Sequence, residues 1–107
     1  WDPEADRVFT TVPNLGLLVE LEYSTGRVLR TWFVGLGMRS VEHDPVRRRV
    51  YFTDFLRGYV HAFDLRTERV TARWFVGRYA RFVRLTRDGS ALLATSNVGI
   101  VRIPLDE

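Results

Sequence analysis

The sequence predicts an all-β fold of short antiparallel strands, and three observations carry that prediction. The 107 residues are 46% hydrophobic, are rich in Val, Tyr, Phe and Thr, and show no convincing helical periodicity. A turn signal built on Gly, Pro, Asp or Ser interrupts the chain about every ten residues. A 42-residue repeat also runs through the chain. Together these features predict one small domain built from copies of a single β unit.

The repeat is visible without gaps. Residues 2–43 align on residues 44–85 with 15 identities in 42 positions, where shuffled sequence of ordinary composition gives roughly three. The longest identical block is Trp-Phe-Val-Gly, which begins at Trp32 and again at Trp74. A third, incomplete copy begins at Thr86. The chain therefore holds about two and a half copies.

The third copy is expected to differ from the second by a deletion of one residue. That deletion sets Gly99 on Gly58 and Val101 on Val60. Both glycines then lie in equivalent turns, where glycine supplies a positive φ.

Each copy is predicted to form four strands, named A to D in chain order. In the second copy we expect strand A at 39–43, strand B at 49–54, strand C at 59–64 and strand D at 69–75; in the third copy we expect strand A at 81–85. By strand order the chain holds strands B to D of a first unit (about 7–35), a complete second unit (about 38–77) and strands A to C of a third (about 80–104).

Two apolar runs predict that both faces of each sheet are covered. Val50-Tyr51-Phe52 and Trp74-Phe75-Val76 do not alternate with polar residues, as strands exposed on one face would. Four-stranded sheets that repeat every 40 to 45 residues and pack on both faces describe the blades of a propeller, whereas a two-sheet sandwich would bury one face only. The predicted fold is a β-propeller segment of about two and a half four-stranded antiparallel blades, with Trp32 and Trp74 packed between neighbouring blades.

Four segments of the second copy resemble the YVTN class of β-propeller repeats. They are Arg-Val-Tyr-Phe-Thr-Asp at 49–54, Gly-Tyr-Val-His-Ala-Phe-Asp at 58–64, Thr-Glu-Arg-Val at 67–70 and Phe-Val-Gly at 75–77. They are also similar to NHL and gluconolactonase-type propeller repeats. The resemblance covers almost the entire chain and implies an architecture, together with a bacterial, periplasmic or extracellular setting, but no chemistry.

The sequence departs from that class at two places. Phe33 and Phe75 stand where strand D usually has proline, and neither copy has the Pro-x-Gly that usually follows the Val-Gly exit. Closed propellers need about four to eight blades. We therefore expect the chain to be part of a larger propeller and to pack against its remaining blades; the alternative is ring closure by a second copy of the chain.

Composition excludes several function classes. There is no cysteine, which excludes disulfides, thiolate catalysis and Cys-ligated metals. No stretch approaches the roughly 18 apolar residues of a membrane-spanning helix, so direct membrane insertion is not expected. All 16 basic residues are arginine, and they are spread along the chain among 13 carboxylates to give a net charge of +3. Such mixing predicts a solvated strand surface and no nucleic-acid partner.

Signals for catalysis and cofactors are weak. His43 and His61 have no carboxylate at a zinc-ligand spacing, and no serine lies in a nucleophile elbow. We predict no catalytic residue, no metal and no cofactor. His43 is expected at a blade interface, and Asp54 and Asp64 as turn caps.

Repeated arginines give the sharpest functional signal. Arg39 and Arg81 hold equivalent places between the outer strand of one blade and the inner strand of the next. The resemblance implies that the D-to-A and B-to-C connections share the face where ligands dock, so these arginines are expected to form an anion-receptive rim. The candidate residues are Arg39, Arg81, Glu42, Arg84, Tyr79 and Arg57. In the alternative, Arg39 and Arg81 pair with carboxylates of neighbouring blades, and Glu42 meets Arg84 or another basic group across the propeller axis.

Two functions follow as hypotheses. The favoured one is a non-catalytic interaction or scaffold module that binds a protein or an anionic ligand through the D-to-A and B-to-C face. The alternative is a gluconolactonase-like hydrolase or lyase with a metal in the central channel, for which Glu42, Asn97 and Asp54 have suitable chemistry.

Overall fold

A computed structural model describes residues 5–105 and confirms the all-β prediction. Its strands are β1 (Arg7–Val12), β2 (Leu17–Glu22), β3 (Val28–Phe33), β4 (Met38–Asp44), β5 (Arg49–Asp54), β6 (Tyr59–Asp64), β7 (Arg69–Phe75), β8 (Val83–Leu85), β9 (Ala91–Ser96) and β10 (Gly99–Pro104). Over these residues there is no helix long and apolar enough to cross a membrane.

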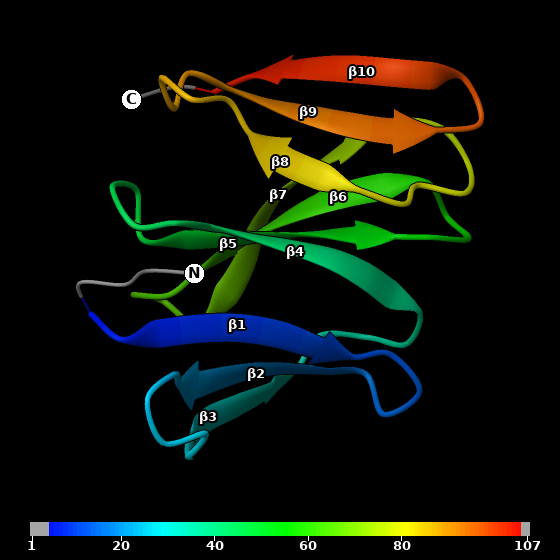
Figure 1. The fold of residues 1–107 in the computed structure, drawn as a ribbon. Helices are drawn as coiled ribbons and strands as arrows, with labels where there is room; N and C mark the ends of the chain where they lie inside the picture. The colour runs from blue at the N-terminus through cyan, green and yellow to red at the C-terminus, as the bar shows by residue number, and fades with distance from the viewer. Residues whose placement is uncertain (1–4, 106–107) are drawn as a thin grey trace.

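The strands form three antiparallel sheets that stack one on another (Figure 1). The first sheet has the order β1-β2-β3, the second β4-β5-β6-β7 and the third β8-β9-β10. Strands B, C and D predicted for the second copy coincide with β5, β6 and β7. Strand A differs from prediction, because β4 is longer than 39–43 and β8 is shorter than 81–85.

The sequence alignment of the third copy is wrong by one residue. Thr53 pairs with Val60 across β5 and β6, and its equivalent Thr95 pairs with Ile100 across β9 and β10. Ile100, not Val101, therefore occupies the place of Val60. The cause is the hairpin loop, which is two residues shorter in the third sheet, and loop length sets the register of a hairpin.

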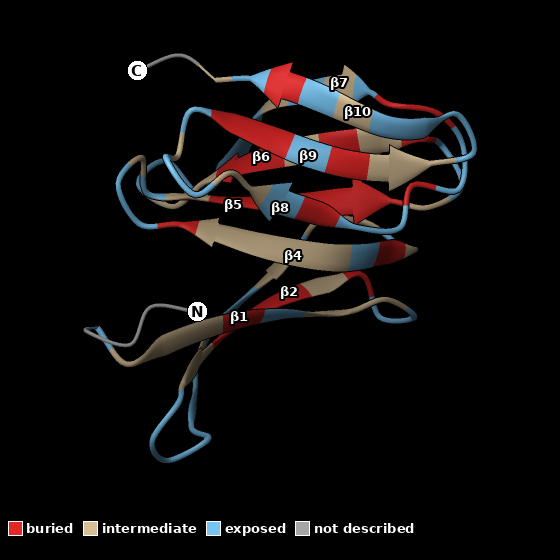
Figure 2. Ribbon diagram, turned by 45° about the horizontal axis from the view of Figure 1, so that its top comes forward, coloured by how far each residue is buried: buried red, intermediate tan, exposed pale blue. Residues whose placement is uncertain are grey.

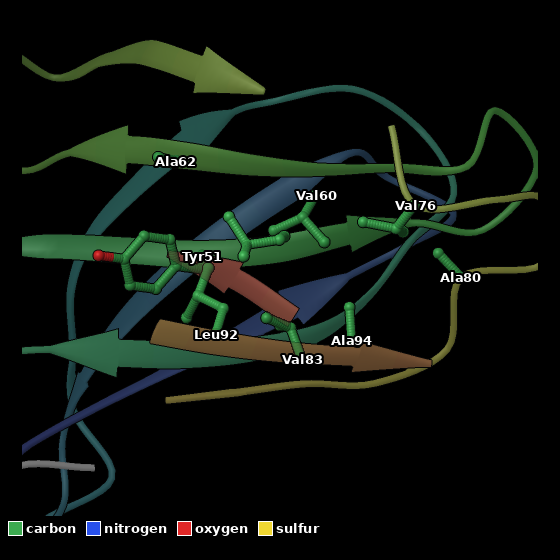
Figure 3. Packing of buried hydrophobic residues seen from close by; sticks show 9 residues of the cluster. Tyr51, Val60, Ala62, Val76, Ala80, Val83, Leu92 and Ala94 are labelled. Atoms are coloured by element: carbon green, nitrogen blue, oxygen red, sulfur yellow. The ribbon is translucent and has the colours of Figure 1, made fainter. Parts of the chain in front are cut away.

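Two apolar cores hold the stack together, one at each boundary between sheets. The core between the first and second sheets consists of Phe9, Leu18, Met38, Val50, Phe52 and Phe63. The core between the second and third sheets includes Tyr51, Val60, Ala62, Val76, Ala80, Val83, Leu92 and Ala94 (Figure 3). In β5, the residues from Val50 to Asp54 are all buried, because this strand lies inside the middle sheet and contributes to both cores.

The tryptophans pack at the boundaries as predicted. Trp32 packs against the first core, with its ring 5.2 Å from that of Phe63, and its indole N–H donates to Glu68 Oε1 at 2.6 Å. Trp74 packs against the second core. Each therefore anchors one sheet to the next.

The prediction that both faces of strand D are covered is wrong. Phe33 at the end of β3 is 74% exposed, and Phe75 at the end of β7 is 64% exposed. Both strands are outer edges of their sheets, with a neighbour on one side only. An unbroken apolar run at the end of such a strand places one aromatic ring in the boundary core and leaves the next in solvent.

Candidate functional site

A hollow of about 420 Å³ opens where β1, β4 and β8 lie side by side and the connections between sheets begin or end. Figure 1 shows these three strands one above another. The hollow is lined by Thr10, Thr11, Arg39, Ser40, Val41, Phe55, Arg81, Phe82 and Arg84. Three of the six candidate site residues, Arg39, Arg81 and Arg84, thus lie around one cavity.

Phe55 organises two of these arginines. The guanidinium carbon of Arg39 lies 4.4 Å from the centroid of the Phe55 ring, and that of Arg81 lies 5.4 Å from it. The negative face of an aromatic ring attracts such cations. One ring from the β5–β6 turn therefore contacts two cations, one from strand β4 and one from the connection between β7 and β8.

Arg84 is held by its own contacts. Its Nη1 donates to Ser40 Oγ at 3.2 Å and to the Val83 carbonyl at 2.8 Å. No ion pair involving Arg39, Arg81 or Arg84 is present in residues 5–105. The expected alternative, in which carboxylates of adjacent sheets neutralise Arg39 and Arg81, therefore does not occur there.

Threonines of the preceding sheet fix the backbone of the two repeated arginines. Thr11 Oγ1 donates to the carbonyl of Arg39 at 3.1 Å, and Thr53 Oγ1 to the carbonyl of Arg81 at 3.5 Å. Thr11 and Thr53 are 42 residues apart, as are Arg39 and Arg81. The repeat thus places both arginines by the same hydrogen bond across a boundary between sheets.

The other candidate residues lie outside the hollow. Glu42 Oε2 accepts the backbone N–H of Leu85 at 2.7 Å, so it links β4 to β8 and does not meet Arg84. Tyr79 adjoins the site, because its ring lies 5.4 Å from that of Phe55. Arg57 pairs with Asp54 at 3.2 Å and lines a separate hollow.

Sequence reasoning missed the aromatic and hydroxyl residues of the hollow. Phe55 and Phe82 supply its apolar wall, and Ser40 supplies a hydroxyl that binds Arg84. The identity of Thr11 and Thr53 in the repeat was a usable signal. The repeat gave no such signal for Phe55, because Pro13 occupies the equivalent position in the first copy.

Two apolar hollows continue outward from the arginines along the same face. The nearer one is lined by Pro13, Asn14, Leu36, Gly37 and Arg39, and the farther one by Leu36, Gly37, Asp54, Leu56 and Arg57. Arg39 lines both the arginine hollow and the nearer apolar hollow. Leu36 lines both apolar hollows. Leu36 and Leu56 are 60% and 68% exposed. The three hollows therefore form one continuous surface, which we call the arginine–leucine groove.

Two aspartates outside the first hollow have structural partners. Asp54 Oδ1 accepts the backbone N–H of Arg57, and Asp64 Oδ1 accepts those of Arg66 and Thr67, which confirms both as turn caps. These backbone bonds hold the pKa of Asp64 below its usual value.

The two histidines lie within the stack. The His43 ring packs 4.6 Å from that of Phe9, at the boundary between the first two sheets, as predicted. His61 Nε2 lies 3.8 Å from Asp54 Oδ2, and burial lowers the pKa of His61 despite that carboxylate. Within residues 5–105 no three His, Asp or Glu side chains gather into a group that could hold a metal ion.

Comparison with known proteins places this arrangement among β-propellers. No protein-family model matches the sequence, and no curated protein matches it. The chain does match solved propeller structures in fold. It aligns over its whole length with 35% of a chain in the crystal structure of a mitotic checkpoint complex, at 12% identity and a TM-score of 0.85.

Two further structures show the same relationship. A 6-phosphogluconolactonase-like protein of Bacteroides fragilis aligns with 96% of this chain over 33% of its own, at 16% identity and a TM-score of 0.79. The β-propeller domain of Myceliophteria thermophila Cps50 (Swd1) aligns with 98% of this chain over 37% of its own, at 14% identity and a TM-score of 0.73. The chain thus has the fold of part of a β-propeller and spans about a third of these chains.

Proposed function

We propose that this protein is a non-catalytic interaction module of a larger β-propeller, and that its arginine–leucine groove binds an anionic group carried by a partner protein or a small ligand. The observation that carries the proposal is the hollow walled by Arg39, Arg81 and Arg84, which includes no carboxylate among its lining residues. Three guanidinium groups around one cavity without an ion pair form a site of unsatisfied positive charge.

The geometry of the arginines supports binding of a carboxylate. Guanidinium groups bind carboxylates through two parallel N–H bonds, and such charge-assisted bonds contribute about 1.5–3 kcal/mol each. Phe55 already restrains two of the guanidinium groups, so less side-chain freedom is lost when an anion binds.

The apolar part of the groove supports a peptide as the carrier of that group. Leu36 and Leu56 lie next to the arginines and are mostly exposed. Exposed apolar residues beside an unpaired charged cluster are typical of interaction surfaces. An acidic segment with apolar neighbours would meet both parts of the groove.

The enzyme alternative gains no specific support. Glu42 is bonded to the backbone of Leu85, and Asp54 to that of Arg57. These carboxylates serve strand and turn contacts in the described part of the chain.

A titration with matched variants tests the proposal. The probes are a fluorescein-labelled peptide of alternating Glu and Leu, followed by anisotropy, and citrate as a competing small anion. We expect the double variant Arg39→Ala, Arg81→Ala to bind the peptide at least about tenfold more weakly, since 1.4 kcal/mol corresponds to tenfold. The control, Arg48→Ala with Arg87→Ala, removes the same charge from exposed residues in the turns at the opposite end of the sheets and should change affinity less than about twofold.

Two outcomes would contradict the proposal. Equal weakening by both double variants would mean that binding follows diffuse positive charge. A large loss of thermal stability in the first double variant, with binding retained, would assign Arg39 and Arg81 to the scaffold. Replacement of both by lysine should also weaken binding, because lysine keeps the charge but loses the bidentate geometry. Competition by citrate as strong as that of unlabelled peptide would identify a small anion as sufficient.

A further inference from the structure

Three ionisable side chains meet beside the farther apolar hollow of the arginine–leucine groove. They are Asp54, Arg57 and His61, which we call the ionisable triad, and the first two line the hollow itself. The Asp54 side chain is 3% exposed and that of His61 is 14% exposed, whereas that of Arg57 is 70% exposed. Figure 2 shows the end of β5, where the triad begins, in the colour of buried residues. The triad therefore connects two largely buried ionisable groups to the open surface of the groove.

The Asp54 carboxylate is shared unevenly between its two basic neighbours. Its Oδ2 atom accepts a hydrogen bond from Arg57 Nη1 at 3.2 Å, while His61 Nε2 lies 3.8 Å from the same oxygen. That nitrogen is buried and has no hydrogen-bond partner among residues 5–105. A separation of 3.8 Å is too long for a hydrogen bond, and a buried polar atom without a partner is costly. His61 is therefore close enough to compete with Arg57 for the carboxylate, although it does not bind it in this structure.

The fold does not need the triad, because the first copy of the repeat lacks it. The residues 42 positions earlier are Val12, Leu15 and Val19, so all three positions are apolar in the first copy and ionisable in the second. Val19 is 7% exposed, which shows that an apolar side chain fills the place of His61 in the equivalent strand β2. Buried charges rarely stabilise a protein more than apolar residues of similar size. The combined replacement therefore indicates a role other than stability.

Three charged side chains act on His61. Asp54 favours its protonated form, whereas Arg73 on the neighbouring strand β7 and Arg57 disfavour it. The remaining titratable neighbour is Tyr59, whose ring centroid lies 6.1 Å from that of His61. Burial has the largest effect and lowers the pKa of His61 from its usual 6.5. The imidazole is therefore neutral at pH 7 and becomes charged only in acidic solution.

We propose that protonation of His61 strengthens anion binding in the arginine–leucine groove, because the imidazolium binds Asp54 and frees the Arg57 guanidinium for the ligand. This inference rests on the anion-binding proposal and assigns a regulation to the same groove. Protonation changes the net charge of the triad from zero to one positive charge, next to the surface where the anion binds. By linkage, a ligand that prefers the protonated form must also favour proton uptake by His61. Affinity should therefore increase as the pH falls.

Calorimetric titration with the unlabelled peptide of alternating Glu and Leu tests this regulation. From pH 7.5 to pH 5.5 the glutamates stay largely ionised, and the affinity should rise at least about threefold, as expected for one additional partly exposed charge pair. Binding should also take up protons, which calorimetry in two buffers of different ionisation enthalpy measures. Both effects should vanish in His61→Gln. The matched control is His43→Gln, which removes the other histidine of the chain and should keep both effects.

A histidine titration followed by NMR tests the triad without any ligand. Arg57→Ala should raise the pH midpoint of His61 by at least about half a pH unit, because the Asp54 carboxylate then has the imidazolium as its counter-charge and a repulsive neighbour is gone. The control Arg66→Ala breaks the exposed ion pair with Asp64 at the other end of β6. It should leave the midpoint of His61 unchanged.

The outcomes separate this regulation from the binding on which it rests. An affinity that is equal at the two pH values, an equal gain in His61→Gln, or an unchanged His61 midpoint in Arg57→Ala would overturn the regulation and leave anion binding intact. If the double variant Arg39→Ala, Arg81→Ala bound the peptide as tightly as the unchanged protein at both pH values, the anion-binding proposal would be wrong, and the regulation with it.

Discussion

The two turns at opposite ends of β5 have the same local chemistry and different surroundings. Each contains an aspartate followed three residues later by an arginine. Asp44 Oδ1 accepts the backbone N–H of Arg47 at 3.2 Å and Oδ2 pairs with its Nη1 at 3.1 Å; for Asp54 and Arg57 the distances are 3.1 and 3.2 Å. The two turns are thus built by one sequence rule.

The neighbouring sheet makes the difference between them. The Arg47 side chain is 11% exposed and also donates to the Gly89 carbonyl of the third sheet at 2.7 Å. The Arg57 side chain is 70% exposed and lines the arginine–leucine groove. The same ion pair therefore joins two sheets at one end of β5 and faces solvent at the other, and packing, not local sequence, decides which role it has.

Removal of Arg47 should give the largest effect. Arg47→Ala leaves the carboxylate of Asp44, which is 1% exposed, without its counter-charge, and such a loss costs about 3–5 kcal/mol. Urea unfolding followed by tryptophan fluorescence measures the change. A loss below about 1 kcal/mol would show that the Tyr51 hydroxyl, which donates to Asp44 Oδ2 at 2.8 Å, is enough to stabilise the charge.

A pair of glycine variants tests how tightly the solvent-facing turn is packed. A Cβ on Gly58 would lie 2.7 Å from the backbone of Gly77, whereas a Cβ on Gly26 would meet nothing within 4 Å; φ is positive at both. Gly58→Ala should therefore cost about 1–3 kcal/mol more than Gly26→Ala, as overpacked sites do. If thermal unfolding showed that Gly58→Ala and Gly26→Ala lose equal stability, the positive φ alone would account for the loss.

The pH dependence of stability should show the burial of His61 beside Asp54. Burial lowers the pKa of His61 from its usual 6.5, so the unfolded chain binds a proton more readily than the folded one. Stability should be complete above pH 6.5 and fall as the pH drops below it, by about 1.4 kcal/mol for each tenfold difference in proton affinity. His61→Gln should flatten this part of the curve between pH 7 and 5. If the slope of stability against pH were unchanged in His61→Gln, the pH dependence in this range would come from the carboxylates.

Removal of Arg57 should give the smallest effect. Arg57→Ala removes a guanidinium that is 70% exposed and therefore screened by water, so we expect a loss of about 1 kcal/mol. The Asp54 carboxylate is itself buried, but it keeps the bond from the backbone N–H of residue 57 and lies 3.8 Å from His61. Urea unfolding under the conditions used for Arg47→Ala makes the comparison direct. If Arg47→Ala and Arg57→Ala lowered the free energy of unfolding equally, the different burial of the two arginines would have no effect on stability.

Sequence alone predicted strands B, C and D of the second sheet, because β-branched and aromatic runs there are separated by strong turn signals. The repeat also predicted that Arg39 and Arg81 hold equivalent places, and each of them has its carbonyl bonded by a threonine of the preceding sheet. It could not reveal Phe55, which has Pro13 as its counterpart, nor the bond of Glu42 to the Leu85 backbone. Side-chain partners depend on how adjacent sheets approach each other, and that information is not local.

The register of β10 escaped prediction for a different reason. The sequence alignment matched Gly99 to the turn residue Gly58. Gly99 is instead the first residue of β10, because the loop before it is shorter in the third copy. A difference of one residue turns every side chain of a strand to the other face. The exposure of Ile100 could therefore be interpreted only after the pairing was known.

The outer strands also bear on how the protein behaves in concentrated solution. β3 and β7 each have one edge with no neighbouring strand among the described residues, and such edges invite strand addition and fibril formation. Arg30 on β3 and Arg69 and Arg73 on β7 are exposed. Arg30 is paired with Glu20 at 2.7 Å. Arg69 and Arg73 have no ion pair among the described residues, so edge-to-edge pairing of β7 between molecules would bring these like charges together, and this repulsion opposes aggregation. Arginine, the only basic residue type in the chain, thus supplies charged protection along the outer edge of the second sheet.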